Sequence, residues 1–253
     1  MSRQEKAAQA GKARNWNEVT PMSLYSRHVL PLLTHLAMRN KAMAAERARW
    51  IPMATGVVLE IGMGSGLNVP FYGTNVAKLY ALEPSEQLRL MAIPRATRAA
   101  FPVEFLAASA EAIPLPAASV EWLVTTWTLC SIANPVAALR EFQRVLRPEG
   151  RVMFVEHGRS PDPGVLRWQD WLTPVWRRLA GGCHLNRPID RMIVEAGFAI
   201  EELERGYIRG PRFGAYLYRG FARSCLPRSR GPLTDAATSP LDLGRPVKAE
   251  RSG

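Results

Sequence analysis

The chain of 253 residues has few cysteines and no long hydrophobic run. Its three cysteines, Cys130, Cys183 and Cys225, are far apart and form no CxxC pair. They therefore indicate no disulfide framework, zinc motif or redox couple, and we expect no metal site. No stretch approaches the roughly 18 consecutive apolar residues of a membrane-spanning helix. The N-terminal arm is polar and basic with no apolar segment behind it, unlike a signal peptide, so we expect a cytoplasmic protein.

Acidic residues are outnumbered by basic ones, 22 against 33, which gives a formal net charge of +11. Such an excess attracts nucleic acid, anionic membranes or anionic small molecules, but it determines nothing about the fold. The arginines are spread along the chain, which favours a solvated basic surface over a nucleic-acid site. Peripheral contact with an anionic membrane stays open. An RNA-associated or non-catalytic cofactor-binding protein is supported by the charge alone.

Hydrophobic residues make up 47% of the chain and are arranged as alternating strands and helices. The pattern predicts strands at 56–61, 77–82, 103–107, 120–126 and 151–156, with helices at 85–99 and 135–146. It then predicts helices at 165–179 and 188–196, and strands at 199–204 and 214–221. Alternation of this kind predicts βαβ units. We therefore expect a doubly wound, mostly parallel α/β sheet of seven strands with an antiparallel edge pair.

Domain boundaries follow from where the apolar pattern starts and stops. Residues 1–18 are expected to form a flexible basic arm and residues 226–253 a disordered tail, with a single domain at 19–225. Within it, residues 19–52 show helical spacing and form either a core helix or a lid over a ligand pocket. Pro31 is expected to kink or split the first helix.

The most informative segment is the strand and turn VVLEIGMGSGLN, which contains Gly62, Gly64 and Gly66. Glycines are needed where the backbone has positive φ or lies against a ligand. At the carboxyl end of the first strand, such a turn borders the ligand crevice. The dinucleotide motif GxGxxG would need glycine at Leu67, and no phosphate-binding lysine follows as in a P-loop. Those two nucleotide-binding motifs are therefore excluded.

Two acidic residues suggest which ligand the turn binds. Glu60 precedes the turn, and an acid there suits a ligand with an ammonium group better than a pyrophosphate. Glu83 lies twenty-one positions after Gly62, at the end of the second strand, where an acid can accept hydrogen bonds from ribose hydroxyls. Its alternative role is to cap the next helix. S-adenosylmethionine carries an ammonium and a sulfonium and no phosphate, so it is the expected cofactor.

The central segments also carry a family resemblance. The stretches ASAEAIPLPAASVEWLVTTWTLCSI, RVLRPEGR, FVEH and GGCHLNR resemble those of class I methyltransferases of the ubiquinone-methylase-like, type 11 group. Within that group the chain is most similar to the alkyl-thiol methyltransferases and to related phospholipid N-methyltransferases. The resemblance covers about residues 29–223. It implies a Rossmann-like class I methyltransferase fold and S-adenosylmethionine-dependent methyl transfer.

The resemblance also implies a cofactor site, with each position assigned by motif. Glu60, Gly62 and Gly64 would hold the methionine end, in the turn that also includes Gly66. The ribose would be bound by Glu83, with Pro84 and Ser85 near the adenine. The rest of the pocket would be formed by Ser109, Ala110, Glu111, Thr126, Trp127 and Thr128. Two positions depart from the family: Ser109 stands where Asp is frequent, and Glu149 replaces the first glycine of a PGG turn.

Methyl transfer from a sulfonium is an in-line displacement, so the protein mainly aligns the reactants. A thiol or carbon acceptor must still lose a proton, and His157 after the fifth strand and His184 are the candidate bases. Each is equally interpretable as a structural hydrogen-bonding group. Cys183 is expected to be a packing residue. The tryptophans at 168, 171 and 176 are expected in the core first and in an acceptor pocket second.

Several acceptors are argued against by missing motifs. Strand four ends in TTWT rather than the DPPY-like tetrapeptide of base amino methyltransferases, and the paired glutamates of protein-arginine methyltransferases are missing. The open acceptors are a small thiol or sulfide, a phospholipid amine and an isoprenoid quinone ring. A small thiol is the leading hypothesis. The oligomeric state is undetermined by sequence.

Overall fold

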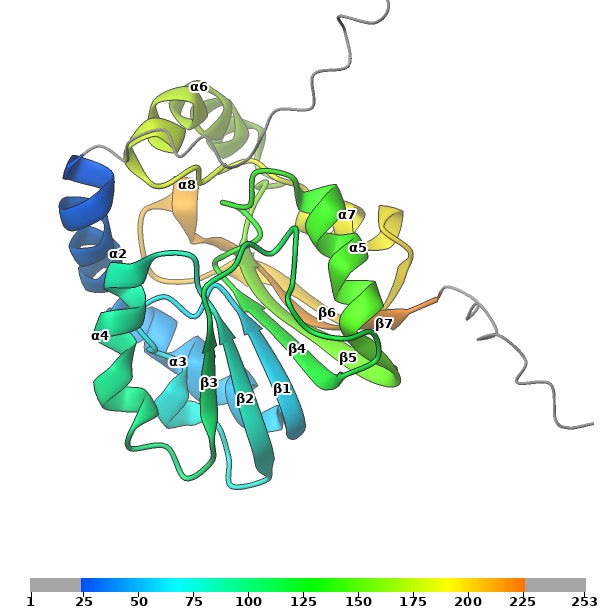
Figure 1. The fold of residues 1–253 in the computed structure, drawn as a ribbon. Helices are drawn as coiled ribbons and strands as arrows, with labels where there is room; N and C mark the ends of the chain where they lie inside the picture. Colours follow the sequence, from blue (N-terminus) through cyan, green and yellow to red (C-terminus); the bar gives the residue numbers. More distant parts are fainter. Residues whose placement is uncertain (1–23, 226–253) are drawn as a thin grey trace, which may run out of the picture.

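The computed structural model describes residues 24–225. The arm predicted at 1–18 and the tail predicted at 226–253 lie outside the described residues. Those described form a central seven-stranded sheet with helices on both faces (Figure 1). The predicted α/β class and the doubly wound arrangement are therefore confirmed.

The sheet has the strand order β3-β2-β1-β4-β5-β7-β6. Its strands are β1 (Gly56–Ile61), β2 (Val76–Leu82), β3 (Val103–Leu106), β4 (Val120–Thr126), β5 (Leu146–His157), β6 (Phe198–Tyr207) and β7 (Tyr216–Ser224). The first five are mutually parallel, whereas β7 is antiparallel to both β5 and β6. The strand order reverses at β1, because β2 and β3 lie on one side of it and β4 and β5 on the other, and a ligand crevice is expected at the carboxyl ends of such strands.

The described helices pack around this sheet. They are η1 (Tyr25–Val29, a π-helix), α2 (Leu30–Met38), α3 (Lys41–Trp50), η2 (Ile51–Met53), η3 (Val69–Phe71), α4 (Glu86–Ala96), α5 (Pro135–Val145), α6 (Pro163–Leu179), α7 (Ile189–Glu195) and α8 (Arg212–Ala215). Four of them begin at a capping side chain that accepts a backbone N–H bond, namely Asn40, Ser85, Asn134 and Asp162. Such caps satisfy amides that the first helical turn leaves without partners.

Alternating residues of each strand bury two separate cores. Leu59 and Ile61 of β1 pack with α5 and α7, through side chains such as Phe142. Val58, just before Leu59 in sequence, packs on the opposite face with Trp50 of α3. Because successive side chains in a strand point to opposite faces, a strand covered on both sides must be apolar throughout. This two-sided burial explains the continuous apolar run that precedes the glycine turn.

Two predictions about local structure are wrong in detail. Pro31 does not split the first helix, because it lies in the first turn of α2, where its missing N–H is tolerated. The break comes instead at residues 39–40, before the cap Asn40. The strand predicted at 214–221 begins later, at Tyr216, because residues 212–215 form the short helix α8.

The core prediction for the tryptophans of α6 is wrong for two of the three. Trp168 is 61% exposed and Trp171 is 69% exposed, and their rings contact each other edge to face. Trp176 is half-buried against Phe213. Helical spacing locates an apolar stripe but does not show which surface covers it. Within residues 24–225, no helix combines the length and hydropathy needed to cross a membrane.

Candidate cofactor and acceptor site

The glycine turn adopts the backbone conformation that its sequence predicts. Gly62, Gly64 and Gly66 have φ values of +65°, +57° and +76°, a region that side chains other than glycine disfavour. The Gly62 N–H donates to the carbonyl of Leu82 at 2.8 Å, which fastens the turn to β2. A Cβ on Gly64 would have no neighbour nearer than 4.0 Å. The backbone at Gly64 is therefore open to a ligand.

A cavity of about 460 Å³ lies against this turn. Its walls come from the carboxyl ends of β1, β2 and β4, from the loops after β3 and α6, and from the N-terminal helices η1 and α2. The helix α2 contributes Leu30, Pro31 and Thr34. It is also joined to the turn, because His35 Nδ1 lies 2.6 Å from Ser65 Oγ. The N-terminal helix thus forms one wall of the cavity, and its role as a lid stays a prediction.

Glu83 is the acidic side chain held most firmly at the cavity wall. Its Oε2 accepts the Gly64 N–H and its Oε1 accepts the Ser85 N–H, both at 2.9 Å. Burial raises the pKa of Glu83, and these two backbone bonds act in the opposite direction. Ser85 caps α4 with its own hydroxyl. Capping is therefore the role of Ser85, and the Glu83 carboxylate stays available at the end of β2.

Most of the predicted cofactor residues meet at this one cavity. Those that line it are Gly62, Gly64, Glu83, Pro84, Ser85, Ser109, Ala110, Glu111, Trp127 and Thr128. Three others do not line it: Glu60, Gly66 and Thr126. Gly66 instead allows α4 to approach, since a Cβ there would lie 3.1 Å from the Cβ of Ala92. Thr126 accepts a hydrogen bond from Asn68 beneath the turn.

Glu60 lies below the turn in a buried polar network. Its two oxygens accept hydrogen bonds from Asn68 Nδ2 and the Tyr72 hydroxyl, both at 2.9 Å. Asn68 in turn accepts from Arg47 Nε at 2.9 Å, and the Arg47 guanidinium lies 4.9 Å from the Trp127 ring centre. Buried polar groups need such partners. The sequence pattern did not identify this network, because Arg47 reaches it from another helix.

Stability should depend on pH through Glu60. Burial raises the pKa of this carboxyl from 4.5 to about 7. The unfolded chain ionises it at lower pH, so its contribution to stability is complete below pH 4.5 and is lost as pH rises through about 7. We expect Glu60→Gln to flatten the slope of unfolding free energy against pH in this window. Across the window, the change in unfolding free energy should differ between the two proteins by about 3 kcal/mol at most. Urea denaturation at a series of pH values measures it. The exposed Glu86→Gln is the control, and a slope in Glu60→Gln equal to that of the control would contradict the prediction.

Trp127 marks a strained point at the end of β4. It has φ +51°, one of two positive values among the described non-glycine residues. Its indole N–H is buried without a hydrogen-bond partner. Non-glycine residues in this region cost free energy and concentrate at functional sites. Thr128, next in sequence, donates its hydroxyl to the carbonyl of Thr126 at 3.0 Å, which shapes the turn at the cavity wall.

Neither candidate base lines the cavity. His157 ends β5 and is 92% buried, with its Nε2 3.1 Å from the Sγ of Cys183. His184 lies in the loop after α6, with its Nδ1 3.2 Å from the carbonyl oxygen of Cys130. Burial lowers the pKa of His184. Each histidine thus contacts one of the two cysteines, while its role as a base stays a prediction.

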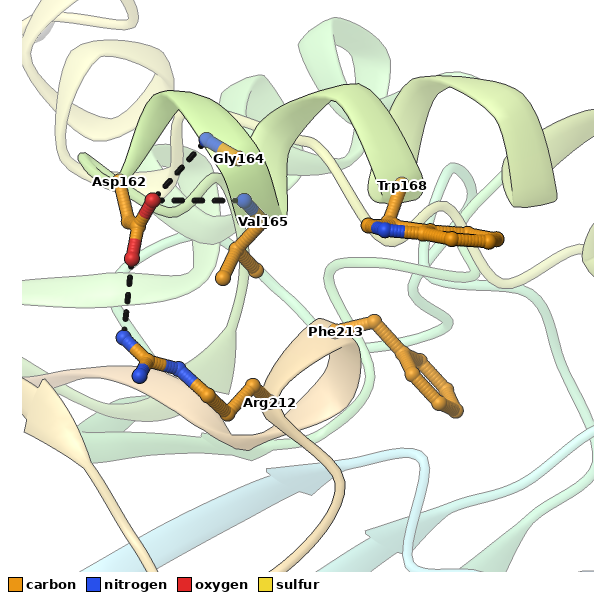
Figure 2. Close-up of a pocket in the computed structure, with 6 residues that line it drawn as sticks. All are labelled: Asp162, Gly164, Val165, Trp168, Arg212 and Phe213. Carbon is orange, nitrogen blue, oxygen red and sulfur yellow. Dashed lines mark hydrogen bonds and ion pairs between the residues drawn. The ribbon is translucent and has the colours of Figure 1, made fainter.

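A second hollow of about 440 Å³ lies between α6 and α8 (Figure 2). Its polar groups have structural partners. Asp162 accepts the Gly164 N–H at 2.9 Å at the start of α6, and its other oxygen pairs with Arg212 at 2.9 Å. Val165, Trp168 and Phe213 complete the wall. Because its charged groups are already paired, this hollow is explained by helix capping and is not the cofactor site.

Known proteins resemble this chain in sequence and in fold. A family model described as a methyltransferase domain matches residues 59–154. Thiol S-methyltransferase TMT1B of Rattus norvegicus is 34% identical over 151 residues, which is 58% of this chain and 62% of that protein. A ubiquinone/menaquinone biosynthesis C-methyltransferase of Hahella chejuensis is 38% identical over 68 residues, 27% of each chain. The chain thus spans less than two thirds of the length of each of these two relatives.

The fold also resembles that of a solved methyltransferase structure. The crystal structure of an S-adenosylmethionine-dependent methyltransferase from Thermotoga maritima superposes with a TM-score of 0.56 at 19% identity, covering 78% of this chain and 97% of that one. The parallel sheet with an antiparallel last pair and the glycine turn at the end of β1 are both found in the described residues. The described residues therefore share the fold of this solved methyltransferase, and residues 59–154 match the methyltransferase domain model.

Proposed function

We propose that the protein transfers the methyl group of S-adenosylmethionine to a small thiol. The observation that carries the choice of cofactor is the charge of the cavity: its charged lining residues, Glu83 and Glu111, are both acidic. An acidic wall suits a sulfonium and disfavours a phosphate. The bare backbone at Gly64 leaves room for the methionine end, and Glu83 is in place for ribose hydroxyls.

The thiol preference rests on two motifs that meet at the same cavity. Ser131 and Ile132 belong to TLCSI, and Gly181 belongs to GGCHLNR. All three line the cavity wall, although the motifs lie about fifty residues apart. The rat relative that bears the name thiol S-methyltransferase adds support. When bound, S-adenosylmethionine supplies an activated methyl group, and the residues of this chain align the acceptor and exclude water.

The test is a methyl-transfer assay with labelled S-adenosylmethionine and a panel of acceptors. The panel holds an alkyl thiol, an aryl thiol, phosphatidylethanolamine vesicles and a quinol. We expect thioether products from at least one thiol, identified by mass. Turnover of the lipid amine or of the quinol without turnover of any thiol would overturn the proposed acceptor. Exclusive quinol methylation would favour the chemistry named for the Hahella relative.

A phospholipid amine is the second candidate acceptor, and an exposed apolar surface favours it. This α2–α6 face consists of Leu32, Leu33, Leu36, Trp168, Trp171, Val175 and Leu179, each at least 48% exposed. The Tyr25 hydroxyl of η1, which directly precedes α2, donates to the Leu179 carbonyl at the end of α6 at 2.7 Å. Figure 1 shows α2 and α6 near one another at the same end of the molecule. Basic residues such as Arg177 and Arg178 on α6 would complement anionic lipid.

We expect the double substitution of Trp168 and Trp171 by serine to weaken binding to anionic vesicles by about tenfold or more. Each indole that leaves the lipid interface forfeits roughly 1.5–3 kcal/mol. Vesicle co-sedimentation measures the change. The matched control is Val194→Ser, which is 55% exposed and lies on α7, an element that contributes no residue to this face. Equal vesicle binding by the double variant and the control would contradict membrane docking and remove the support for a lipid acceptor.

A further inference from the structure

A cluster of two thiols and an imidazole lies outside the residues that line the cavity. Cys130 follows β4, His157 ends β5, and Cys183 follows α6. Their ligand atoms all lie within 4.8 Å of one another, and His157 Nε2 is 3.1 Å from Cys183 Sγ. All three side chains are more than nine-tenths buried. Sequence spacing did not reveal this close approach, because the three residues come from distant segments of the chain.

The backbone around the cluster holds the three segments together. The parallel pairing of β4 with β5 brings Cys130 and His157 to the same edge of the sheet. The backbone N–H of His184 then donates to the carbonyl of Cys130 at 2.9 Å, which fastens the loop of Cys183 to the loop of Cys130. The cluster is therefore a product of the fold, and its ligands are held before any ion binds.

We propose that Cys130, His157 and Cys183 bind a Zn²⁺ ion through two thiolates and one imidazole nitrogen. Zn–S and Zn–N bonds of about 2.3 and 2.0 Å in a tetrahedral site place neighbouring ligand atoms about 3.6–3.8 Å apart. The observed separations bracket this range, so small side-chain rotations suffice. Soft thiolates with imidazole in tetrahedral geometry select zinc among common divalent ions. Three protein ligands leave a fourth position open, as in catalytic zinc sites.

Buried polar and charged groups border the cluster. The His157 Nδ1 atom is buried and has no hydrogen-bond partner. Arg187 is half-buried beside the cluster and donates to the Leu129 carbonyl. Zinc with two thiolates is neutral, and the Arg187 charge would balance one further anionic ligand.

That fourth ligand is inferred to be the acceptor thiol, which makes this step dependent on the proposed function. Ser131, next to Cys130, and Gly181, two residues before Cys183, both line the cavity. A thiol that coordinates zinc is deprotonated outright, and its proton passes to water. The thiolate sulfur then bonds to the methyl carbon as the methyl–sulfonium bond breaks, giving a thioether and S-adenosylhomocysteine. In this proposal the ion supplies the deprotonation, and His157 acts as its ligand.

Cobalt substitution of the full-length protein tests the site. Protein reduced with a phosphine is freed of metal by chelation and titrated with Co²⁺, then with Zn²⁺. We expect about one ion per chain, a thiolate-to-cobalt charge-transfer absorption, and its loss on zinc addition. Cys130→Ser and Cys183→Ser should lose this absorption, whereas Cys225→Ser should retain it, since Cys225 is exposed and outside the cluster. No stoichiometric binding by the reduced protein, or equal binding by the cluster variants, would overturn the site.

Thiol labelling covers the case in which a cluster variant fails to fold. In the unmodified protein, Zn²⁺ should slow iodoacetamide labelling of Cys130 and Cys183 and leave Cys225 unaffected. Unchanged labelling of all three, or formation of a Cys130–Cys183 disulfide with no metal uptake, would overturn the proposal.

The open position is tested separately with benzyl mercaptan as the probe. Its addition to the cobalt protein should shift the charge-transfer absorption, and an unchanged spectrum would overturn thiol ligation. Metal uptake requires no turnover, so the two proposals fail independently. A protein that methylates thiols and binds no metal overturns the zinc site alone. A zinc-binding protein that methylates only a lipid amine overturns the thiol acceptor alone.

Discussion

Glu83→Ala should weaken the binding of S-adenosylmethionine by about 100-fold, equivalent to roughly 2.7 kcal/mol. The Glu83 carboxylate uses one acceptor site on each oxygen for the amides of Gly64 and Ser85. A carboxylate has about four such sites, so two remain for the ribose hydroxyls. Hydrogen bonds to charged groups contribute about 1.5–3 kcal/mol each. Removing the side chain also frees the Gly64 amide from the geometry that the turn needs.

Titration calorimetry with S-adenosylhomocysteine measures this effect without turnover. Glu83→Gln keeps the size of the side chain and one acceptor oxygen, so its loss should be intermediate, about tenfold. Glu86→Gln, three residues on and exposed, is the control. Thermal unfolding shows whether each variant is folded before binding is compared. An affinity of Glu83→Ala within about twofold of the control would contradict the ribose role.

Gly220→Ala should lower the free energy of unfolding by about 3 kcal/mol or more. Gly220 lies in β7 at φ +155°, and a Cβ there would lie 1.8 Å from the carbonyl oxygen of Glu202. That oxygen belongs to the backbone of β6, where the pairing register shifts between Ile200 and Glu202. Backbone of a paired strand cannot rotate aside as a side chain does. The two edge strands would have to separate locally.

Urea denaturation of the two proteins tests the prediction. Gly214→Ala is the matched control, because no atom lies within 4 Å of the Cβ position there and its φ is not positive. We expect that control to change stability by less than about 1 kcal/mol. A Gly220→Ala protein as stable as Gly214→Ala would show that β6 and β7 adjust at low cost.

Local patterns were sufficient for the elements and for most of the cofactor cavity. The strands predicted at 56–61 and 120–126 match β1 and β4 at both ends, because a strand covered on both faces needs a continuous apolar run. The positive φ at Gly62, Gly64 and Gly66 was likewise readable, since glycine is selected by local backbone conformation. Such features depend only on residues that are close in the chain, so a single sequence contains the information needed to predict them.

Features that depend on contacts between distant segments could not be predicted from the sequence. Arg47 reaches Asn68 from another helix, and no spacing rule connects the two positions. The exposure of Trp168 and Trp171 depends on whether a partner surface covers α6, which a helical period does not encode.

By itself, the sequence determined the α/β class, the glycine turn and the acid at the end of β2, because each is set by residues within one strand or one turn. Only the tertiary structure decided that Glu60 lies beneath the cavity and that α2 forms one of its walls. It also decided that Cys130, His157 and Cys183 meet. These residues come from three segments up to 53 positions apart. Their proximity follows from strand pairing and loop packing, which depend on the whole chain at once.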